Sequence, residues 1–141
     1  MPLVRLIYAS KKTEDWNDSE LEALIKSAQE HNHRHLVTGC LCFNRKYFMQ
    51  CLEGSRSQVN LIYNQIIQDK RHKEVELMCY QYIDERDFGQ WDMYYVPDSK
   101  ITQELILKYS GVNDLDPYAM TNTGALRFLK EAIEQTSGSR S

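Results

Sequence analysis

The stretch KYFMQCLEG, residues 46–54, predicts a β-strand with a polar residue in its middle. Side chains alternate between the two faces of a strand, so Phe48, Gln50 and Leu52 point to the same face. Two of them are large apolar groups that belong against a core, and the amide of Gln50 lies between them. A buried amide without a hydrogen-bond partner costs about 1–3 kcal/mol, so Gln50 is expected to have a specific partner.

Four further segments with strand-like composition surround this one. TGCLCF (38–43) precedes it and is joined to it by the short polar turn NRK, which predicts a β-hairpin. LVRLIYAS (3–10) alternates apolar side chains and predicts a first strand. VELMCYQYI (75–83) and WDMYYV (91–96) are rich in β-branched and aromatic residues. They predict a fourth and a fifth strand, the last stopped by Pro97.

An amphipathic helix is predicted between the first two strands, in WNDSELEALIKSAQEHN (16–32). Ser19 and Glu22 have the spacing of a capping box, and Asp18 is an alternative N-cap. Continuing its apolar stripe by four residues reaches Asn32, so this amide is also expected to face inward. The stripe itself consists of Leu21, Leu24, Ile25 and Ala28.

A second amphipathic helix, SQVNLIYNQIIQD (57–69), follows the hairpin and starts at Ser55 or Ser57. Asp69 continues its inward face, three residues after Ile66. The connection that follows, KRHKE, is polar and basic. The apolar stripe of this helix consists of Val59, Ile62, Tyr63, Ile66 and Ile67.

The order of these elements predicts an α+β fold, a ferredoxin-like βαββαβ sandwich with an added edge strand. The two helices cover one face of the sheet, and the other face needs a cover. Residues 98–135 can supply it as a C-terminal two-helix cap, whose second helix is preceded by Asp116-Pro117 as N-cap and first residue. The predicted organisation is therefore a domain at 1–97, a cap at 98–135 and a flexible tail at 136–141.

Composition limits the classes of function. The chain has 141 residues, a net charge of −3 and an apolar content of 42%, which are ordinary values for one globular domain. A pI near 5.8 argues against a dedicated nucleic-acid-binding protein. No apolar run approaches the length of about 20 residues that spans a bilayer, and no signal peptide is recognisable at the start. A cytoplasmic location without a membrane partner is expected.

The four cysteines all lie in apolar, strand-like segments. The first two form C-x-C rather than the C-x-x-C pattern that suits tetrahedral zinc. Small buried thiols in a reducing compartment are expected, with neither a disulfide nor a metal site. These cysteines are Cys40, Cys42, Cys51 and Cys79.

Three polar side chains are predicted to meet on the helix-facing side of the sheet. The first and third strands are central neighbours in this topology, so Tyr8 and Gln50 lie side by side, and Asn32 reaches the same place from the first helix. Apolar walls with a few directional polar groups are typical of a small-molecule site. The pattern equally allows these groups to bond only to one another within a packed core. The walls expected here are Ile25, Phe48 and Ile66.

In five motifs the chain resembles the BLUF domain family of flavin-binding blue-light sensors, in its short, stand-alone type. The motifs occur in the family's order and spacing, and the resemblance covers about residues 1–97, with 98–135 matching the two-helix cap. They are LIYAS (6–10), HNHRHLVTGCLCF (31–43), YFMQCLEG (47–54), DKRH (69–72) and RDFGQWDM (86–93).

The resemblance implies that FAD binds with its isoalloxazine ring between the two helices. It makes Tyr8 the photoactive tyrosine and Gln50 the switching glutamine beside flavin N5 and C4=O. Trp91 and Met93 then belong to the fifth strand, where the family exchanges positions around the glutamine. The other implied cofactor contacts are Phe48, Ile25 and Ile66 on the ring, Asn32 on its amide edge, Arg71 near O2, His31, and more weakly Asp69.

Two positions depart from the family's pattern. Leu36 stands where glycine is common, which affects a loop without a predicted flavin contact. His31 stands where many members have asparagine, so a modified polar contact is expected. His31 and His35 are one helical turn apart, which raises the question of a metal ion, but the end of a helix favours such side chains without one.

The implied function is a blue-light photoreceptor rather than an enzyme. Light would move an electron and a proton from Tyr8, rearrange the hydrogen bonds of Gln50 and so switch a signalling state. A homo-oligomer and a separate effector protein are expected, such as a cyclic-dinucleotide enzyme or a transcription regulator. A flavin-dependent redox enzyme and a ligand-free interaction module are the alternatives. An acylphosphatase-like hydrolase is disfavoured because the stretch KKTEDWND (11–18) has no glycine to cradle an anion.

Overall fold

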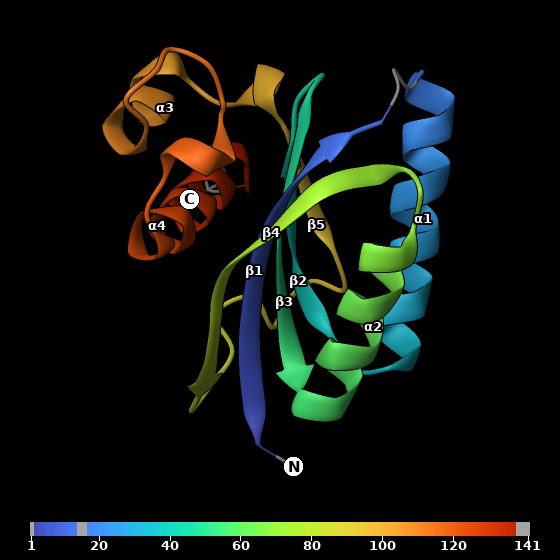
Figure 1. Ribbon diagram of the computed structural model, residues 1–141. Coiled ribbons are helices and arrows are strands. Elements are labelled where there is room, and N and C mark those ends of the chain that lie inside the picture. Colours follow the sequence, from blue (N-terminus) through green and yellow to red (C-terminus); the bar gives the residue numbers. More distant parts are fainter. Residues whose placement is uncertain (1, 14–16, 138–141) are drawn as a thin grey trace.

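The structure, a computed structural model, describes residues 2–13 and 17–137 and contains a mixed sheet between two helical layers (Figure 1). The strands are β1 (Leu3–Lys12), β2 (Thr38–Phe43), β3 (Tyr47–Ser55), β4 (His72–Ile83) and β5 (Tyr94–Pro97). The helices are α1 (Asp18–Arg34), α2 (Arg56–Gln68), α3 (Gln103–Tyr109) and α4 (Asn122–Ser137). Short 3₁₀ turns, η1 (Asp98–Lys100) and η2 (Pro117–Ala119), lie in the C-terminal part.

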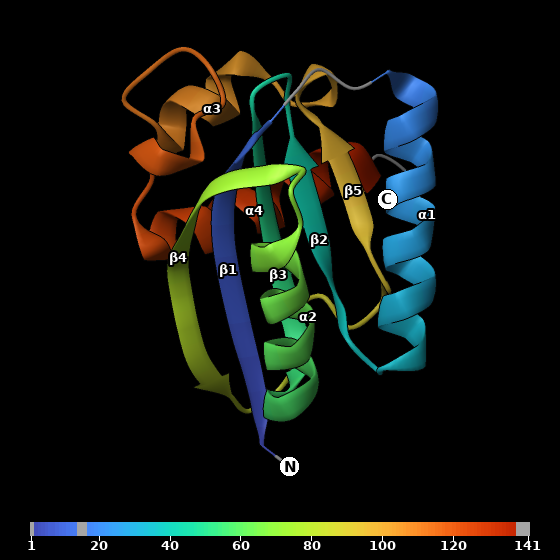
Figure 2. The same ribbon diagram turned by 45° about the vertical axis from the view of Figure 1, so that its right-hand side comes forward.

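The sheet has the strand order β4-β1-β3-β2-β5, as Figure 2 shows. β1 is central and pairs antiparallel with both β3 and β4, and in the first pair Tyr8 lies directly opposite Gln50. β4 and β5 are the two edge strands, and β5 runs parallel to β2. The predicted ferredoxin-like sandwich with an added edge strand is therefore confirmed, and the expected neighbourhood of the first and third strands holds.

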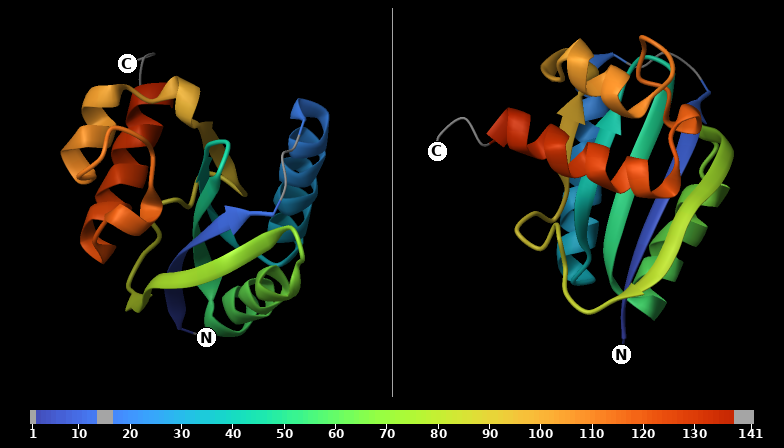
Figure 3. Two further views of the ribbon diagram at one scale, coloured as in Figure 1. Left: turned by 45° about the horizontal axis from the view of Figure 1, so that its top comes forward. Right: turned by 90° about the vertical axis from the view of Figure 1, so that its left-hand side faces the viewer.

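The strands β1, β2 and β3 are buried on both faces because α1 and α2 cover one side of the sheet and α3 and α4 cover the other (Figure 3). Alternation along β1 sends Val4, Leu6 and Tyr8 to a helix-side core, and Ile7 and Ala9 to a cap-side core. The helix-side core also contains Ile25, Leu41, Phe48, Leu52, Val59, Ile62 and Met93. The cap-side core also contains Met49, Phe88, Leu105, Leu115, Phe128 and Leu129. A strand buried on both faces explains the near-continuous apolar runs in the sequence.

Local differences from the predicted boundaries have identifiable causes. The N-cap of α1 is Asn17, whose Oδ1 accepts from Glu20 N at 2.8 Å, so the capping box lies two residues before the expected Ser19 and Glu22 pair. Residue 16, where the helix was expected to begin, lies outside the described residues. β4 begins at His72, earlier than expected, because β1 extends to Lys12 and pairs with it there.

The predicted start of the fifth strand at residue 91 is wrong. β5 begins at Tyr94, and Trp91 and Met93 belong to the loop before it. Gly39 N donates to Trp91 O at 3.1 Å, which fixes this loop against the start of β2. Because residues 91–93 are not paired in the sheet, the two side chains can point to opposite faces. Met93 lies in the helix-side core, and Trp91 packs against the cap-side core.

The second cap helix also begins later than predicted. Asp116 and Pro117 cap the turn η2, where Asp116 Oδ1 accepts from Tyr118 N at 3.0 Å, and α4 follows from Asn122. α4 extends to Ser137, so the first two residues of the predicted tail are helical. The remainder of that tail, 138–141, lies outside the described residues.

The cysteines carry free thiols, and burial raises the pKa of all four. Cys40, Cys42 and Cys51 are buried and Cys79 is half-buried, as their apolar surroundings predict. Within residues 2–13 and 17–137, no helix is both long and apolar enough to cross a bilayer.

Close contact between β2 and β3 makes Gly39 a position where a side chain cannot fit. A Cβ there would lie 1.9 Å from the carbonyl oxygen of Cys51, a backbone atom that cannot turn away. We expect Gly39→Ala to lower the free energy of unfolding by about 3 kcal/mol or more, measured by denaturant unfolding. Gly111→Ala is the control, since nothing lies within 4 Å of the place that a Cβ would take there. Equal unfolding midpoints for the two variants would contradict this prediction.

Candidate functional site

A cavity of about 280 Å³ lies between α1, α2 and the helix-side face of the sheet. Its size is close to the lower end of ligand pockets, roughly 300–1,000 Å³. The structure brings nine residues singled out in the sequence to its wall: Tyr8, Ile25, His31, Asn32, Phe48, Gln50, Ile66, Asp69 and Arg71. Residues that the sequence reasoning did not select also line it, among them Leu24, Ser27, Ala28, Arg34, Leu41, Ile62, Gln65 and His72.

The partner of Gln50 is Tyr8. The hydroxyl of Tyr8 donates to Oε1 of Gln50 at 2.5 Å, across the central strand pair. Burial, with smaller contributions from Tyr63 and Asp69, raises the pKa of Tyr8 well above its usual value, so the phenol is neutral and keeps its proton. Nε2 of Gln50 donates to the thioether sulfur of Met93 at 3.5 Å, a weak acceptor.

The last turns of α1 are bonded to the loop that carries Met93. Asn32 faces inward as predicted, and its Nδ2 donates to the backbone oxygen of Asp92 at 2.9 Å. Gln29 donates from Nε2 to the backbone oxygen of Met93, also at 2.9 Å. The ring of His33 lies 3.1 Å from the carboxylate of Asp92. One wall of the cavity and the loop beside Gln50 therefore share a set of hydrogen bonds.

The polar end of the cavity is formed by the residues that follow α2. Asp69 accepts from the guanidinium and the backbone nitrogen of Arg71, both at 2.9 Å. These hydrogen bonds and the charge of Arg71 lower the pKa of Asp69, and the bond to Asp69 raises the pKa of Arg71. The guanidinium of Arg71 is therefore held beside Asp69 at the wall of the cavity.

His72 is the most informative residue that sequence reasoning missed. Its Nδ1 lies 2.8 Å from Oγ of Ser10, and its ring centroid lies 4.9 Å from that of Phe48 and 6.3 Å from that of Tyr8. Burial lowers its pKa, which favours the neutral ring. His72 is the last residue of the motif DKRH, but the basic composition of this motif by itself indicates only a connection between elements.

His31 has a buried ring nitrogen that a ligand could bond. Its Nε2 is buried and has no hydrogen-bond partner of normal geometry within residues 2–13 and 17–137. Burial, then the nearby His35 and Arg34, lowers its pKa, and a contact with Gln65 only partly offsets this. The rings of His31 and His35 lie 4.4 Å apart. In the part of the chain that the structure describes, no group of three or more histidine, cysteine or acidic side chains could hold a metal ion.

Met93 and Trp91, both expected near Gln50, lie in different places. Met93 is 2% exposed and contacts Gln50 directly. Trp91 is half-buried, packs against Tyr94 with ring centroids 5.2 Å apart, and does not line the cavity. In this structure the position beside Gln50 is occupied by the thioether and not by the indole.

Comparison with known sequences identifies relatives of this chain. The family model for sensors of blue-light using FAD, BLUF, matches residues 3–94. The blue light- and temperature-regulated antirepressor BluF of Escherichia coli is 41% identical over 92 residues, which are 64% of this chain and 23% of that protein. Photoactivated adenylate cyclase subunit alpha of Euglena gracilis is 31% identical over 80% of this chain and 11% of its own length. The chain thus spans less than a quarter of these curated relatives.

Solved structures show the same architecture over nearly the whole chain. BlsA in its photo-activated state superposes with a TM-score of 0.83 at 30% identity, covering 93% of this chain and 94% of that one. BlrB, a BLUF protein in the dark state, gives a TM-score of 0.75 over 94% of this chain and 95% of that one. At 24% identity, this second likeness concerns the fold alone.

The family match extends over most of the sheet, both α1 and α2, and the complete cavity wall. The buried tyrosine and glutamine lie within the matched segment. The chain belongs to the BLUF family, the sensor domains that detect blue light using FAD.

Proposed function

We propose that this chain binds the isoalloxazine ring of FAD in the cavity between α1 and α2 and acts as a blue-light switch. In this proposal Tyr8 supplies an electron and a proton, and Gln50 stores the result as a changed set of hydrogen bonds. The observation that carries the proposal is the hydrogen bond of 2.5 Å between these side chains at the cavity wall.

The residues around the cavity fit such a ring. Ile25 and Ile66, from the two helices, supply apolar side chains to its opposite walls, which suits a flat aromatic group. The polar groups that line the cavity and could meet the edge of a ring are Asn32, the Arg71 guanidinium and Nε2 of His31, which is buried and has no hydrogen-bond partner among the described residues. A heteroaromatic edge with oxygens and an N–H would give Nε2 of His31 a hydrogen-bond partner.

Tyr8 is suited to give up an electron and a proton together. When bound, the flavin supplies the absorption of blue light and an excited state that can oxidise a phenol. Because burial raises the pKa of Tyr8, its hydroxyl keeps the proton until the light-driven step. Oε1 of Gln50 already accepts the hydrogen bond of that hydroxyl, so it is in place to receive the proton. Return of the electron and proton restores the neutral phenol.

The amide of Gln50 can adopt a second set of hydrogen bonds at a small cost in free energy. Its Nε2 donates to the sulfur of Met93, and a thioether is a weak acceptor, so this bond is the easiest of the group to exchange. Rotation or tautomerisation of the amide presents a donor where an acceptor stood. Met93 then loses its contact, and the loop before β5 is biased towards a different position until the dark arrangement returns.

The switched loop would pass the signal to an effector. The relatives include an antirepressor and light-regulated adenylate cyclases, which are different kinds of output. We propose that the loop 84–93 and the cap present the changed surface to such an effector, such as a transcription regulator or a cyclic-dinucleotide enzyme, within a homo-oligomer. Nucleic acid and membranes are not among the proposed partners.

Removing either member of the pair should separate cofactor binding from switching. Tyr8→Phe and Gln50→Leu keep the size of the side chains in the cavity wall, so both variants are expected to bind FAD and give yellow protein. Both are expected to lose the reversible red shift after blue light. Tyr63→Phe is the control: its ring lies 5.7 Å from that of Tyr8 and should leave the shift intact. Absorption spectra before and after illumination test this. A normal shift in either variant refutes its assigned role, while a colourless wild-type protein or steady NAD(P)H oxidation in the dark would favour the alternatives.

Asn32 should matter for affinity as well as for the loop. Asn32→Ala removes a polar group from the cavity wall, and we expect FAD binding to weaken about tenfold, the effect of about 1.4 kcal/mol. Gln29→Ala is matched, because it also loses a hydrogen bond of 2.9 Å to the same loop but does not line the cavity. Titration of the apoprotein with FAD, followed by flavin fluorescence, gives both dissociation constants. Equal constants for the two variants would remove Asn32 from the site.

The raised pKa of Tyr8 predicts how switching depends on pH. An ordinary tyrosine is ionised to about a quarter at pH 9.5, and a phenolate has no proton to transfer. Since burial raises the pKa of Tyr8 above 10.0, its phenol stays protonated there. We expect the amplitude of the red shift to be equal at about pH 7 and about pH 9.5, measured on the same sample after pH exchange. A loss of amplitude that follows tyrosine ionisation would contradict this prediction.

A further inference from the structure

β3 carries two buried polar side chains that face opposite sides of the sheet. Gln50 points to the cavity under α1 and α2, and Glu53 points to the cap side together with Arg5, its neighbour in register on β1. Glu53 is 0% exposed. A carboxylate in such a place destabilises the protein unless it is paired and fully hydrogen-bonded, so its partners indicate what it does.

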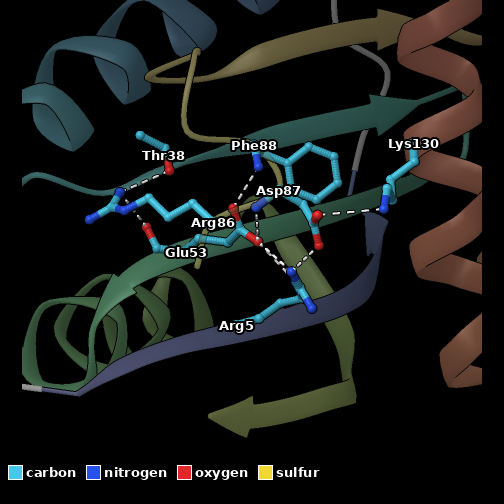
Figure 4. Close-up of polar contacts among 7 residues, drawn as sticks. All are labelled: Arg5, Thr38, Glu53, Arg86, Asp87, Phe88 and Lys130. Carbon is cyan, nitrogen blue, oxygen red and sulfur yellow. Dashed lines mark hydrogen bonds and ion pairs between the residues drawn. The ribbon is translucent and has the colours of Figure 1, made fainter. Parts of the chain in front are cut away.

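The partners of Glu53 hold the loop between β4 and β5, as Figure 4 shows. Oε1 accepts from the backbone nitrogen of Phe88 at 2.7 Å, and Oε2 accepts from that of Asp87 at 3.1 Å. Oε2 also accepts from Nε of Arg5 at 2.9 Å, and Arg5 bonds in turn to the carboxylate of Asp87. Arg86 donates to the backbone oxygen of Glu53 at 3.2 Å and to Thr38 at 2.9 Å.

The segment from Asp87 to Met93 is therefore anchored at both ends to β3. Glu53 binds its start through two backbone N–H groups, and Met93 at its end accepts from Gln50. Between these ends, Trp91 N donates to Phe88 O at 3.3 Å, which keeps the segment short and turned. Asn32 and Gln29 also hold the backbone of residues 92 and 93, and through this short segment a shift of the Met93 backbone would disturb the bonds to Glu53.

We propose that Glu53 is a positioning residue of the photocycle, which sets the position of Met93 against Gln50 and so the lifetime of the switched state. This inference rests on the proposed function of Gln50. Glu53 acts through the loop and does not touch the cofactor cavity. Lys130 of α4 lies 3.5 Å from the carboxylate of Asp87, so the same anchor also connects the loop to the cap.

The test is a double-mutant cycle on the rate of dark recovery. Glu53→Gln keeps the shape of the side chain but weakens its hold on Arg5 and the two N–H groups. We expect it to retain FAD and the red shift and to speed recovery at least about threefold. In a Met93→Ala background the loop no longer holds a thioether against Gln50, so the same substitution should have almost no further effect. Coupling of this kind is what a shared element produces, whereas independent sites act additively.

A control separates positioning from general stability. Leu115→Ala opens a cavity in the cap-side core, where Leu115 is 1% exposed and lies outside the loop 84–93. At a similar loss of melting temperature, it should leave recovery unchanged. The proposal is overturned if Leu115→Ala speeds recovery as much, or if Glu53→Gln acts equally with and without Met93.

Three further outcomes of these experiments decide between the proposals. If Glu53→Gln does not fold, Asp87→Asn replaces it in the cycle and is judged by the same two criteria, since it weakens the contacts with Arg5 and Lys130 and leaves Glu53 in place. If Gln50→Leu keeps the reversible shift, the proposed function fails. If Gln50→Leu abolishes the shift and Glu53→Gln leaves recovery unchanged, only the role of Glu53 fails.

Discussion

The hydrogen bond between the Tyr8 hydroxyl and the Gln50 amide is the interaction around which the rest of the structure is arranged. It joins two central strands at a point where both side chains are shielded from water, so neither can exchange its partner for solvent. The antiparallel register of β1 and β3 places the two residues opposite one another. A slip of one residue would send one of them to the cap side. The many apolar residues of these strands therefore fix the geometry of two polar ones.

Burial of β3 on both faces gives it two separate polar environments. On one face, Gln50 is bonded to groups that can change partners, a phenol and a thioether. On the other, Glu53 is bonded to a guanidinium and two backbone N–H groups, which are strong donors with fixed positions. The loop 84–93 contacts both. This combination of an exchangeable bond and a rigid anchor suits the proposed switch, in which the loop occupies two positions.

The structure also explains one departure from the family's pattern. Leu36, where glycine is common, has a φ of 57° and lies in the left-handed region that glycine adopts most readily. Its side chain is 76% exposed, so it clashes with no neighbour, and its carbonyl accepts from Arg86 at 2.8 Å. The loop keeps a glycine-like conformation at a cost of about 1–2 kcal/mol for the backbone, and Leu36 does not line the cavity.

The sequence by itself determined the order of the elements and the inward faces of the helices. Periodicity alone also singled out Tyr8, Asn32 and Gln50, because a polar residue within an apolar stripe is visible in the sequence. It misplaced the beginning of β5 because aromatic residues favour both strands and packed loops. Only the tertiary structure decided that Met93 rather than Trp91 lies beside Gln50, that His72 lines the cavity, and that Glu53 holds the loop. These contacts join residues that are distant in the chain or lie in irregular segments, where no repeating pattern records which side chain meets which.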